Sequence, residues 1–321
     1  MDLWLILTIL ASVGATFSAF IDNFLTDVYF KGRTPQAQKC FYGPVYCAIA
    51  IVVFVVYLIS TPFEYIPFSN LFLLFLSGVI SSIASIAYYI ALKDEDTTGV
   101  AIFLQLSPIF YLLLGTVFLG ERIHGIQLLA FLIILAAPLT IIFSARKRGK
   151  KLEYRAVLFI LIYIVIYSFS HILFVFAERG LTEQGFDLPI IVAVATLLFG
   201  KGLLDIILSL SIKKWRLRAR YIYRSSKKKV LVPVIANAGI WAVVDYLNRA
   251  ALVLGQVAVV SAVYNTAELL ETFVFGLILT LIWPKFGREK LNRRTIVAHL
   301  AAMILAMVGV FIVDHPELFG G

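Results

Sequence analysis

The chain has 321 residues, of which 61% are hydrophobic and only 15% are charged, and its mean hydropathy is +0.95. A soluble domain carries about a quarter charged residues, so this composition excludes a soluble globular protein and indicates an integral, multi-pass membrane protein. The formal net charge of +9 could suit nucleic acid, but the cations stand between long apolar runs, which favours loops beside an inner or plasma cell membrane.

Ten apolar runs are long enough to cross a bilayer, since about 20 residues of helix span roughly 30 Å of hydrocarbon. Helices are expected because each one satisfies its own backbone hydrogen bonds in lipid. The predicted all-α fold therefore has ten transmembrane helices. In chain order they cover residues 3–25, 40–60, 68–92, 98–119, 124–143, 156–177, 188–211, 230–254, 257–282 and 294–313.

The Lys and Arg residues are distributed unevenly between the connections. Of the 28, 24 lie in the connections that follow the odd-numbered spans or, for Arg294, at the boundary of one. This bias predicts that those connections are cytoplasmic and that both termini lie outside. The longest connection, Lys213 to Lys229, interleaves Trp215, Tyr221 and Tyr223 with cations. That mixture is typical of contact with anionic lipid headgroups, so we expect lipid and not nucleic acid as its partner.

A weak internal repeat appears when the sequence is shifted by 160 residues. Ala91 to Pro108 then aligns without a gap on Ala251 to Glu268, and each segment joins the end of one span to the start of the next. The alignment divides the chain into two sets of five spans, residues 1–150 and 151–321. Because five is odd, the second set enters the membrane upside down. Such 5+5 inverted repeats are typical of alternating-access transporters, whose binding site lies near the midplane.

Three short motifs lie between Tyr88 and Leu139: Y-x-A-L at Tyr89 to Leu92, L-x-P at Leu106 to Pro108, and FLGER at Phe118 to Arg122. This stretch resembles the drug/metabolite transporter (DMT) superfamily, EamA type. The resemblance implies a 5+5 inverted-repeat fold and the export or exchange of small organic solutes, commonly coupled to protons or a counter-substrate. Members usually have cytoplasmic termini, so either the orientation here is reversed or a span is miscounted.

Ionisable side chains inside the spans are functional candidates, because a charge at mid-bilayer costs at least about 2.5 kcal/mol. Lys201 and Asp205 are four residues apart, as are Asp245 and Arg249, so each pair shares a helical face. We interpret both as structural ion pairs facing the bundle interior, or as a site in which Lys201 or Arg249 binds an anionic substrate group.

Glu268 and Glu271 lie three residues apart in a span without Lys or Arg, with Tyr264 and Asn265 one turn earlier. Two nearby carboxylates in a low dielectric cannot both stay ionised cheaply, so one is expected to hold a proton near neutral pH. We predict that the pair exchanges a proton for a cationic substrate group. The alternative is that both pair with the basic residues of other spans.

Three other side chains receive weaker interpretations. His171 could relay protons or simply be hydrogen-bonded. Trp241, one turn before Asp245, is either a stacking wall for a substrate or a packing residue. Asp22, near the cytoplasmic end of the first span, is interpreted as marking the membrane interface.

The charges inside the last spans also indicate a substrate class. Two cations face four carboxylates, which favours protons, amines or zwitterions over polyanions. We expect secondary-active transport of an amino-acid-like zwitterion or an amine, with transport of phosphorylated anions through Lys201 and Arg249 as the alternative. A membrane-embedded enzyme or a lipid scramblase is the alternative from another class. The sequence has no zinc-protease, serine-hydrolase or phosphate-loop motif, so no enzyme, metal or cofactor is expected. Whether the chain forms a homodimer stays open.

Overall fold

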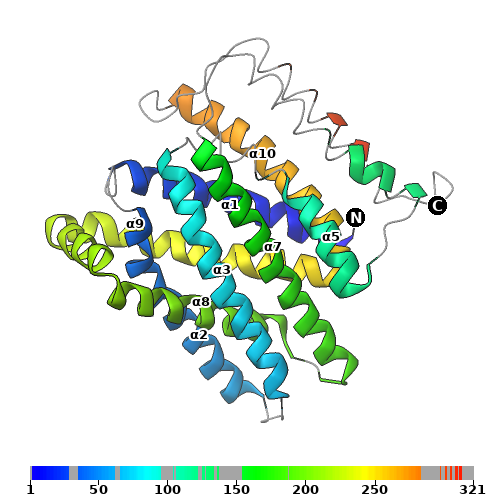
Figure 1. The fold of residues 1–321 in the computed structure, drawn as a ribbon, viewed down its shortest axis with the longest axis horizontal. Helices are drawn as coiled ribbons and strands as arrows, with labels where there is room; N and C mark the ends of the chain where they lie inside the picture. The colour runs from blue at the N-terminus through cyan, green and yellow to red at the C-terminus, as the bar shows by residue number, and fades with distance from the viewer. Residues whose placement is uncertain are drawn as a thin grey trace.

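A computed structural model describes residues 2–28, 35–61, 66–94, 104, 106–121, 125–126, 128–133, 136, 154–186 and 188–282, with eight single residues between 297 and 312. Within these ranges every regular secondary-structure element is a helix (Figure 1). The elements are α1 (Leu3–Val28), η1 (Pro35–Gln38), α2 (Lys39–Ser60), α3 (Phe68–Asp94), α5 (Ser107–Leu119), α7 (Tyr154–Glu183), α8 (Ile190–Ser211), α9 (Lys213–Leu254) and α10 (Val257–Ile282). The predicted all-α class is confirmed for this part of the chain.

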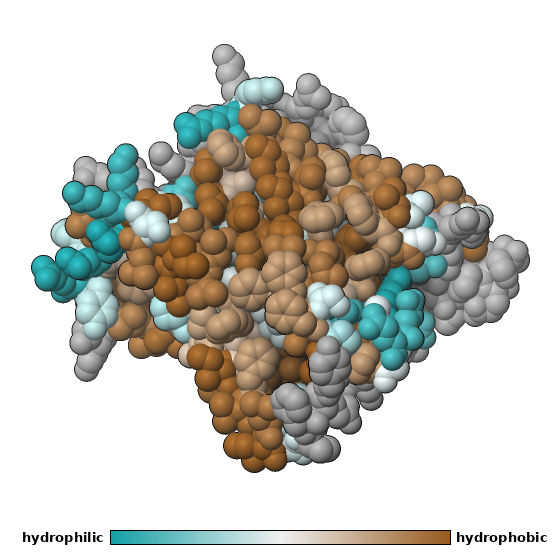
Figure 2. Space-filling view, turned by 60° about the horizontal axis from the view of Figure 1, so that its bottom comes forward, coloured by the Kyte–Doolittle hydropathy of each residue, from teal (hydrophilic) through white to brown (hydrophobic). Residues whose placement is uncertain are grey.

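Seven helices are long and apolar enough to cross a membrane: α1, α2, α3, α7, α8, α10 and the second part of α9, from Val230. They coincide with seven predicted spans. The fourth span is described only in part, as the 13-residue helix α5, and most of the fifth and tenth spans lie outside the described residues. Hydrophobic side chains also form a broad surface between hydrophilic groups at two opposite edges (Figure 2). The chain is therefore an integral multi-pass membrane protein, although ten spans are not confirmed.

Helix α9 corrects one expectation. The basic stretch Lys213 to Lys229, predicted as a loop, is the helical extension of the eighth span, so α9 has 42 residues. Its length is about 63 Å, roughly twice the hydrocarbon thickness. Trp215, Ala219 and Ile222 recur at helical spacing and are buried. This apolar stripe gives the segment a face to pack, which explains the helix and places Trp215 in the core instead of at the lipid headgroups.

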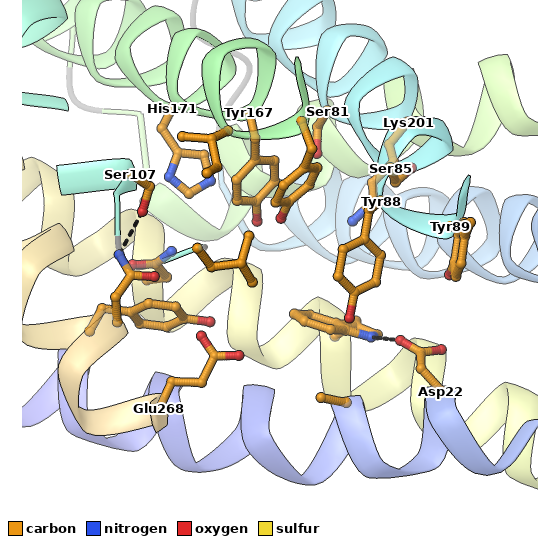
Figure 3. Close-up of a pocket in the computed structure, with 18 of the residues that line it drawn as sticks. Asp22, Ser81, Ser85, Tyr88, Tyr89, Ser107, Tyr167, His171, Lys201 and Glu268 are labelled. Atoms are coloured by element: carbon orange, nitrogen blue, oxygen red, sulfur yellow. Dashed lines mark hydrogen bonds between the residues drawn. The ribbon is translucent and has the colours of Figure 1, made fainter. Parts of the chain in front are cut away.

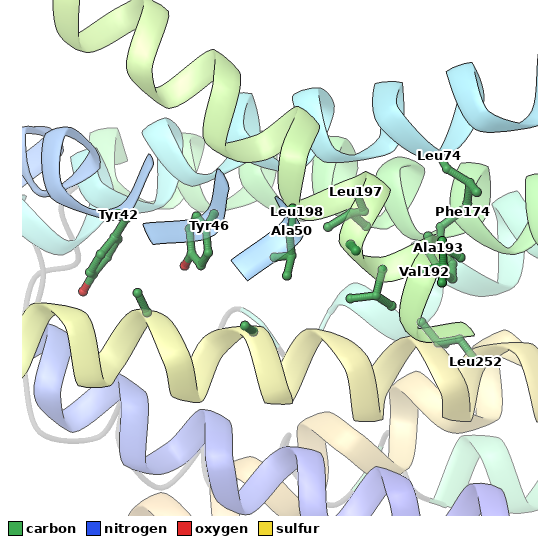
Figure 4. Packing of buried hydrophobic residues seen from close by; sticks show 14 of the residues in the cluster. Tyr42, Tyr46, Ala50, Leu74, Phe174, Val192, Ala193, Leu197, Leu198 and Leu252 are labelled. Atoms are coloured by element: carbon green, nitrogen blue, oxygen red, sulfur yellow. The ribbon is translucent and has the colours of Figure 1, made fainter. Parts of the chain in front are cut away.

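Helices far apart in the sequence lie side by side. α2 packs against α8, α3 against α7 and α8, and α1 against α9 and α10, while α5 packs against α7 and α10. Buried apolar side chains fill the space between them; Tyr46 and Ala50 of α2, for example, face the region of Leu197 and Leu198 of α8 (Figure 4). The core thus joins the first half of the chain to the second.

Glycines set the position of α8 between its neighbours. A Cβ on Gly202 would lie 2.7 Å from the carbonyl oxygen of Gly43 in α2, and one on Gly200 would lie 2.2 Å from that of Phe75 in α3. Both distances are too short for a side chain, so α8 contacts α2 and α3 backbone to backbone. Lys201, between the two glycines, is held where it lines an interior cavity.

Candidate substrate-binding site

The helices enclose a cavity of about 110 Å³. One water molecule needs roughly 10–15 Å³ on the same measure, so the space suits a small organic solute. Five ionisable side chains other than tyrosine and histidine line it: Asp22, Lys39, Lys201, Asp205 and Glu268. Figure 3 shows Glu268 and Asp22 on opposite sides of the view, with Tyr88 and Tyr167 between them.

The cavity brings together most of the predicted site residues. Those that line it are Glu268, Lys201, Asp205, Tyr264, Asn265, Trp241 and His171. Glu271, Asp245 and Arg249 do not line it; they lie behind it and contact other side chains.

Glu268 and Glu271 have different surroundings, although we expected them to act as a pair. The Glu268 side chain faces the cavity, and its carboxylate has no hydrogen-bond or ion-pair partner among the described residues, although its backbone carbonyl accepts from Thr16 (3.3 Å). Glu271 accepts hydrogen bonds from Ser12 (2.9 Å) and Thr16 (3.3 Å) of α1. A step of three residues turns a helix by about 300°, which is about 60° short of a full turn. The side chains of Glu268 and Glu271 therefore point in directions about 60° apart. Neither carboxylate pairs with a basic residue in the part of the chain that is described.

The two predicted intrahelical ion pairs are replaced by pairs between helices. Lys201 Nζ lies 2.9 Å from Asp245 Oδ2, which joins α8 to α9. Asp205 Oδ1 lies 2.7 Å from Lys39 Nζ, which joins α8 to α2. Both intrahelical pairings are therefore wrong. The reason is that Lys201 and Asp205 lie where α8 meets two different neighbours, each of which offers an opposite charge.

Lys39 was expected in the cytoplasmic connection that follows the first span. It lies in the first turn of α2 and is 1% exposed. Besides Asp205, its Nζ donates to the Ser82 carbonyl (2.9 Å) and to Ser85 Oγ (2.7 Å) of α3. A buried ammonium requires hydrogen-bond acceptors of this kind. The Lys39–Asp205 ion pair is therefore fixed at one wall of the cavity.

Arg249 is fully buried but does not reach the cavity. Its guanidinium donates to the Ser170 carbonyl (3.2 Å) and hydroxyl (3.3 Å), and it lies 5.0 Å from the centre of the Phe174 ring. These contacts tie α9 to α7. Arg249 forms no ion pair within the described ranges.

Asp22 is the centre of a hydrogen-bond network, so its interpretation as an interface marker is wrong. It is 2% exposed and accepts bonds from Tyr42 (2.6 Å), Asn237 (2.9 Å) and the Trp241 indole (3.0 Å). The network joins α1 to α2 and α9, and it shows that Trp241 is a hydrogen-bond donor as well as a cavity wall. A carboxylate inside an apolar run was the sequence signal for this role.

Six aromatic rings form a continuous row along the cavity, which we call the aromatic row. In order they are Tyr89, Tyr88, Tyr163, Tyr167, His171 and Tyr111, with successive centroid distances of 5.7, 5.3, 5.0, 4.4 and 5.5 Å. The Tyr111 hydroxyl and His171 Nδ1 are 2.6 Å apart. The row was not predicted from the sequence, although Tyr163, Tyr167 and His171 recur every four residues on α7 and so share one face.

The first part of the chain is similar to a known transporter family. Residues 3–143 match the model of the EamA-like transporter family. The resemblance to the DMT superfamily, which rested on Tyr88 to Leu139, is confirmed over that segment, and it indicates a membrane transporter of the DMT type. No curated protein matches the sequence. A solved crystal structure, described only as that of a protein, shares the fold over 96% of this chain and 98% of its own, with a TM-score of 0.61 at 15% identity.

A turn within the EamA-like segment, at Gly120 and Glu121, contacts helices of the second half of the chain. Gly120 ends α5 in the left-handed conformation (φ 65°). The next residue, Glu121, binds Arg179 of α7 at 2.7 Å and accepts the backbone N–H of Val257, the first residue of α10, at 2.9 Å. The motif carboxylate thus caps the helix that carries Glu268.

The EamA-like segment also contacts α10 near Glu268. Asn265 donates to Ser107 Oγ (2.8 Å), at the first residue of α5, and to the Ser261 carbonyl (2.8 Å). Pro108 of the L-x-P motif follows Ser107, so the motif lies at the start of α5. Asn265 is therefore a positioning residue for the part of α10 that faces the cavity.

Proposed function

We propose that this protein is a secondary-active, alternating-access transporter of a small organic metabolite, an amino-acid-like zwitterion or an amine, exchanged for protons or a counter-substrate. The observation that carries the proposal is Glu268, a carboxylate without a partner among the described residues that lines a solute-sized cavity. A carboxylate at this depth is stabilised by a proton or by a cationic group. Because the same carboxylate binds either a proton or the cationic group of a substrate, binding of the substrate releases the proton and binding of the proton releases the substrate. This competition is the basis of exchange.

The pattern of helix contacts supports the 5+5 inverted repeat of residues 1–150 and 151–321. If α1, α2, α3 and α5 correspond to α7, α8, α9 and α10, each contact between the halves has an exchanged counterpart. The contact α1–α10 matches α7–α5, and α2–α9 matches α8–α3. The cavity lies between these halves, where rocking of one against the other would expose it to each side in turn.

Transport of phosphorylated anions through Lys201 and Arg249 has less support. Lys201 is already paired with Asp245 at 2.9 Å, and Arg249 is sealed behind the cavity wall at 0% exposure. A polyanion would have to separate the first pair and could not reach the second cation.

We also propose an orientation and a lipid contact. The Lys and Arg bias favours termini outside an inner or plasma membrane, with the basic part of α9, Lys213 to Lys229, on the cytoplasmic side. Tyr221 on this segment is 63% exposed, and its neighbouring cations suit anionic headgroups.

Currents evoked by substrates test the proposed function. The purified protein is reconstituted into proteoliposomes on a solid-supported membrane, and amino acids, amines and organic phosphates are applied at pH 5.5 and 7.5. We expect a zwitterion or amine to give a pH-dependent current that Glu268→Gln abolishes. Glu271→Gln is the matched control and keeps the current, because Glu271 lies outside the cavity. A phosphate current that survives Glu268→Gln would overturn the proposal.

A further inference from the structure

Six of the helices around the cavity form two groups of three. In the first, which we call the α7 group, α7 packs against α3 and α5. In the second, the α1 group, α1 packs against α9 and α10. The aromatic row belongs to the α7 group, whereas Asp22, Trp241 and Glu268 belong to the α1 group. Figure 3 shows Tyr167 and His171 on one side of the cavity and Glu268 and Asp22 on the other, so the cavity lies between the groups.

At one end of the cavity, a single carboxylate bonds to both groups. Glu121 Oε1 accepts from Arg179 Nη2 of α7 at 2.7 Å. Glu121 Oε2 accepts the backbone N–H of Val257, at the start of α10, at 2.9 Å. Arg179 Nη2 also lies 3.5 Å from the carbonyl oxygen of Gly255, between α9 and α10. We call these four residues the latch.

The local structure suits a contact that breaks and forms again. Gly120 ends α5 in the left-handed conformation, which directs the chain back across the helix end and fixes where Glu121 begins. The side chains of Arg179 and Glu121 are 33% and 11% exposed, whereas those of Lys39 and Asp205 are each 2% exposed. Water reaches the latch, so its charges can separate at a lower cost in free energy than the buried pair.

The latch covers one end of the cavity without lining it. Each of the four helices that meet at the latch also lines the cavity, through Tyr111 of α5, His171 of α7, Leu252 of α9 and Ser261 of α10. Leu252 lies three residues before Gly255, and Ser261 lies four residues after Val257. The cavity therefore begins within about one helical turn of the latch.

The Asp22 network lies at the opposite end. Helix α1 begins beside the latch, because a Cβ on Gly255 would lie 3.3 Å from Cγ of Trp4. Asp22 follows 18 residues later, which is about 27 Å along a helix. Its bonds to Tyr42 and Trp241 join α1 to α2 and α9, not to the α7 group. The two groups can thus separate at the latch while the Asp22 network stays intact.

We propose that the latch is the gate at this end of the cavity. Glu121 releases Val257 when the cavity opens to that side and binds it again when the cavity opens to the other. This inference rests on the alternating access of the proposed function and names the residues that close one end. Glu121 is a positioning residue, since it controls access and does not touch the substrate. In the proposed orientation this gate is extracytoplasmic, because the latch connections follow even-numbered spans.

The accessibility of two introduced cysteines tests the gate. The two natural cysteines, Cys40 and Cys47, are first replaced by alanine. Ser261→Cys then reports on the latch end of the cavity and Ala19→Cys on the Asp22 end, since both positions line it. Full-length protein in membrane vesicles is treated with sulfonatoethyl methanethiosulfonate, which does not cross the bilayer. The reagent is applied to one face at a time, and the rate of modification is measured.

Loss of the latch should open one end and close the other. Glu121→Ala removes both carboxylate contacts, so modification of Ser261→Cys from the latch face rises about ten-fold or more. Because the two ends open alternately, modification of Ala19→Cys from the opposite face falls. Arg179→Met breaks only the ion pair and gives the same changes at about three-fold. This variant carries the test if Glu121→Ala fails to fold.

Glu183→Gln is the matched control. Glu183 is an exposed carboxylate one turn after Arg179 on α7, and it makes no latch contact. Its substitution removes the same charge near the same arginine, so both rates of modification stay at their original values.

Two results would overturn the inference. In the first, Ser261→Cys reacts at the same rate with and without the latch. In the second, both reporters react faster, which indicates a loosened fold and not a gate. Neither result touches the carboxylate chemistry of the proposed function, which the loss of current in Glu268→Gln tests separately. A pH-dependent current with unchanged reporter rates would leave the transporter proposal intact and remove the gate.

Discussion

Lys39 of α2 and Asp205 of α8 form a buried ion pair, with 2.7 Å between Nζ and Oδ1. The pair bridges the first and second halves of the chain, and the lysine ammonium also donates hydrogen bonds to the Ser82 carbonyl and the Ser85 hydroxyl. Breaking a buried pair by removing one partner costs about 3–5 kcal/mol, because it leaves an uncompensated charge in a low dielectric.

Substitutions of this pair should therefore be strongly non-additive. Lys39→Met and Asp205→Asn each lower thermal stability, and the double variant is more stable than the sum of the two losses predicts. Thermal unfolding in detergent, analysed as a double-mutant cycle, measures the coupling. A coupling energy near zero would contradict the ion pair.

Substrate affinity should depend on pH through Glu268. A proton and a substrate cation compete for the same carboxylate, so the apparent Kd rises as pH falls and the carboxylate becomes protonated. The rise approaches ten-fold per pH unit once the protonated form dominates. Currents recorded between pH 5 and 9 measure this slope. In Glu268→Gln no pH-dependent current is expected.

The Asp22 network should limit how the halves move. Asp22→Asn replaces an acceptor of three hydrogen bonds with a group that also donates, so the contacts with Tyr42, Asn237 and Trp241 cannot all persist. We expect a loss of transport with a shift in tryptophan fluorescence. Trp241→Phe removes one bond and costs only about 1 kcal/mol of stability. Wild-type transport by Asp22→Asn would refute a role for the network.

The glycines beside Lys201 should tolerate no side chain. Gly200→Ala and Gly202→Ala place a Cβ 2.2 and 2.7 Å from backbone carbonyl oxygens, so α8 must separate from α3 or α2. We expect each to destabilise the protein by more than about 2 kcal/mol, as measured by thermal unfolding.

Gly239 provides the matched control, because a Cβ there meets nothing within 4 Å. Gly239→Ala in the interior of α9 should stabilise the helix by about 0.5–1 kcal/mol. Equal effects at positions 200 and 239 would argue against the close approach of α8.

The sequence by itself determined the class of this protein and the course of much of its backbone. Apolar runs of about 20 residues require lipid-spanning helices, and seven of the predicted runs are helices of the expected type. The motifs between Tyr88 and Leu139 identified the EamA-like segment. Several residues of the cavity were also identified from sequence, because a charge in a span is costly and so stands out.

Only the tertiary structure decided which groups meet. Helical periodicity places Lys201 and Asp205 on one face of α8, but it does not say that their partners come from α9 and α2. In the same way, Glu268 and Glu271 lie three positions apart in the sequence. Only the packing of α1 decides that Glu271 is hydrogen-bonded by Ser12, whereas Glu268 lines the cavity. The free energy of a buried charge depends on neighbours from distant parts of the chain, whereas a sequence pattern reports only the helix on which the charge lies.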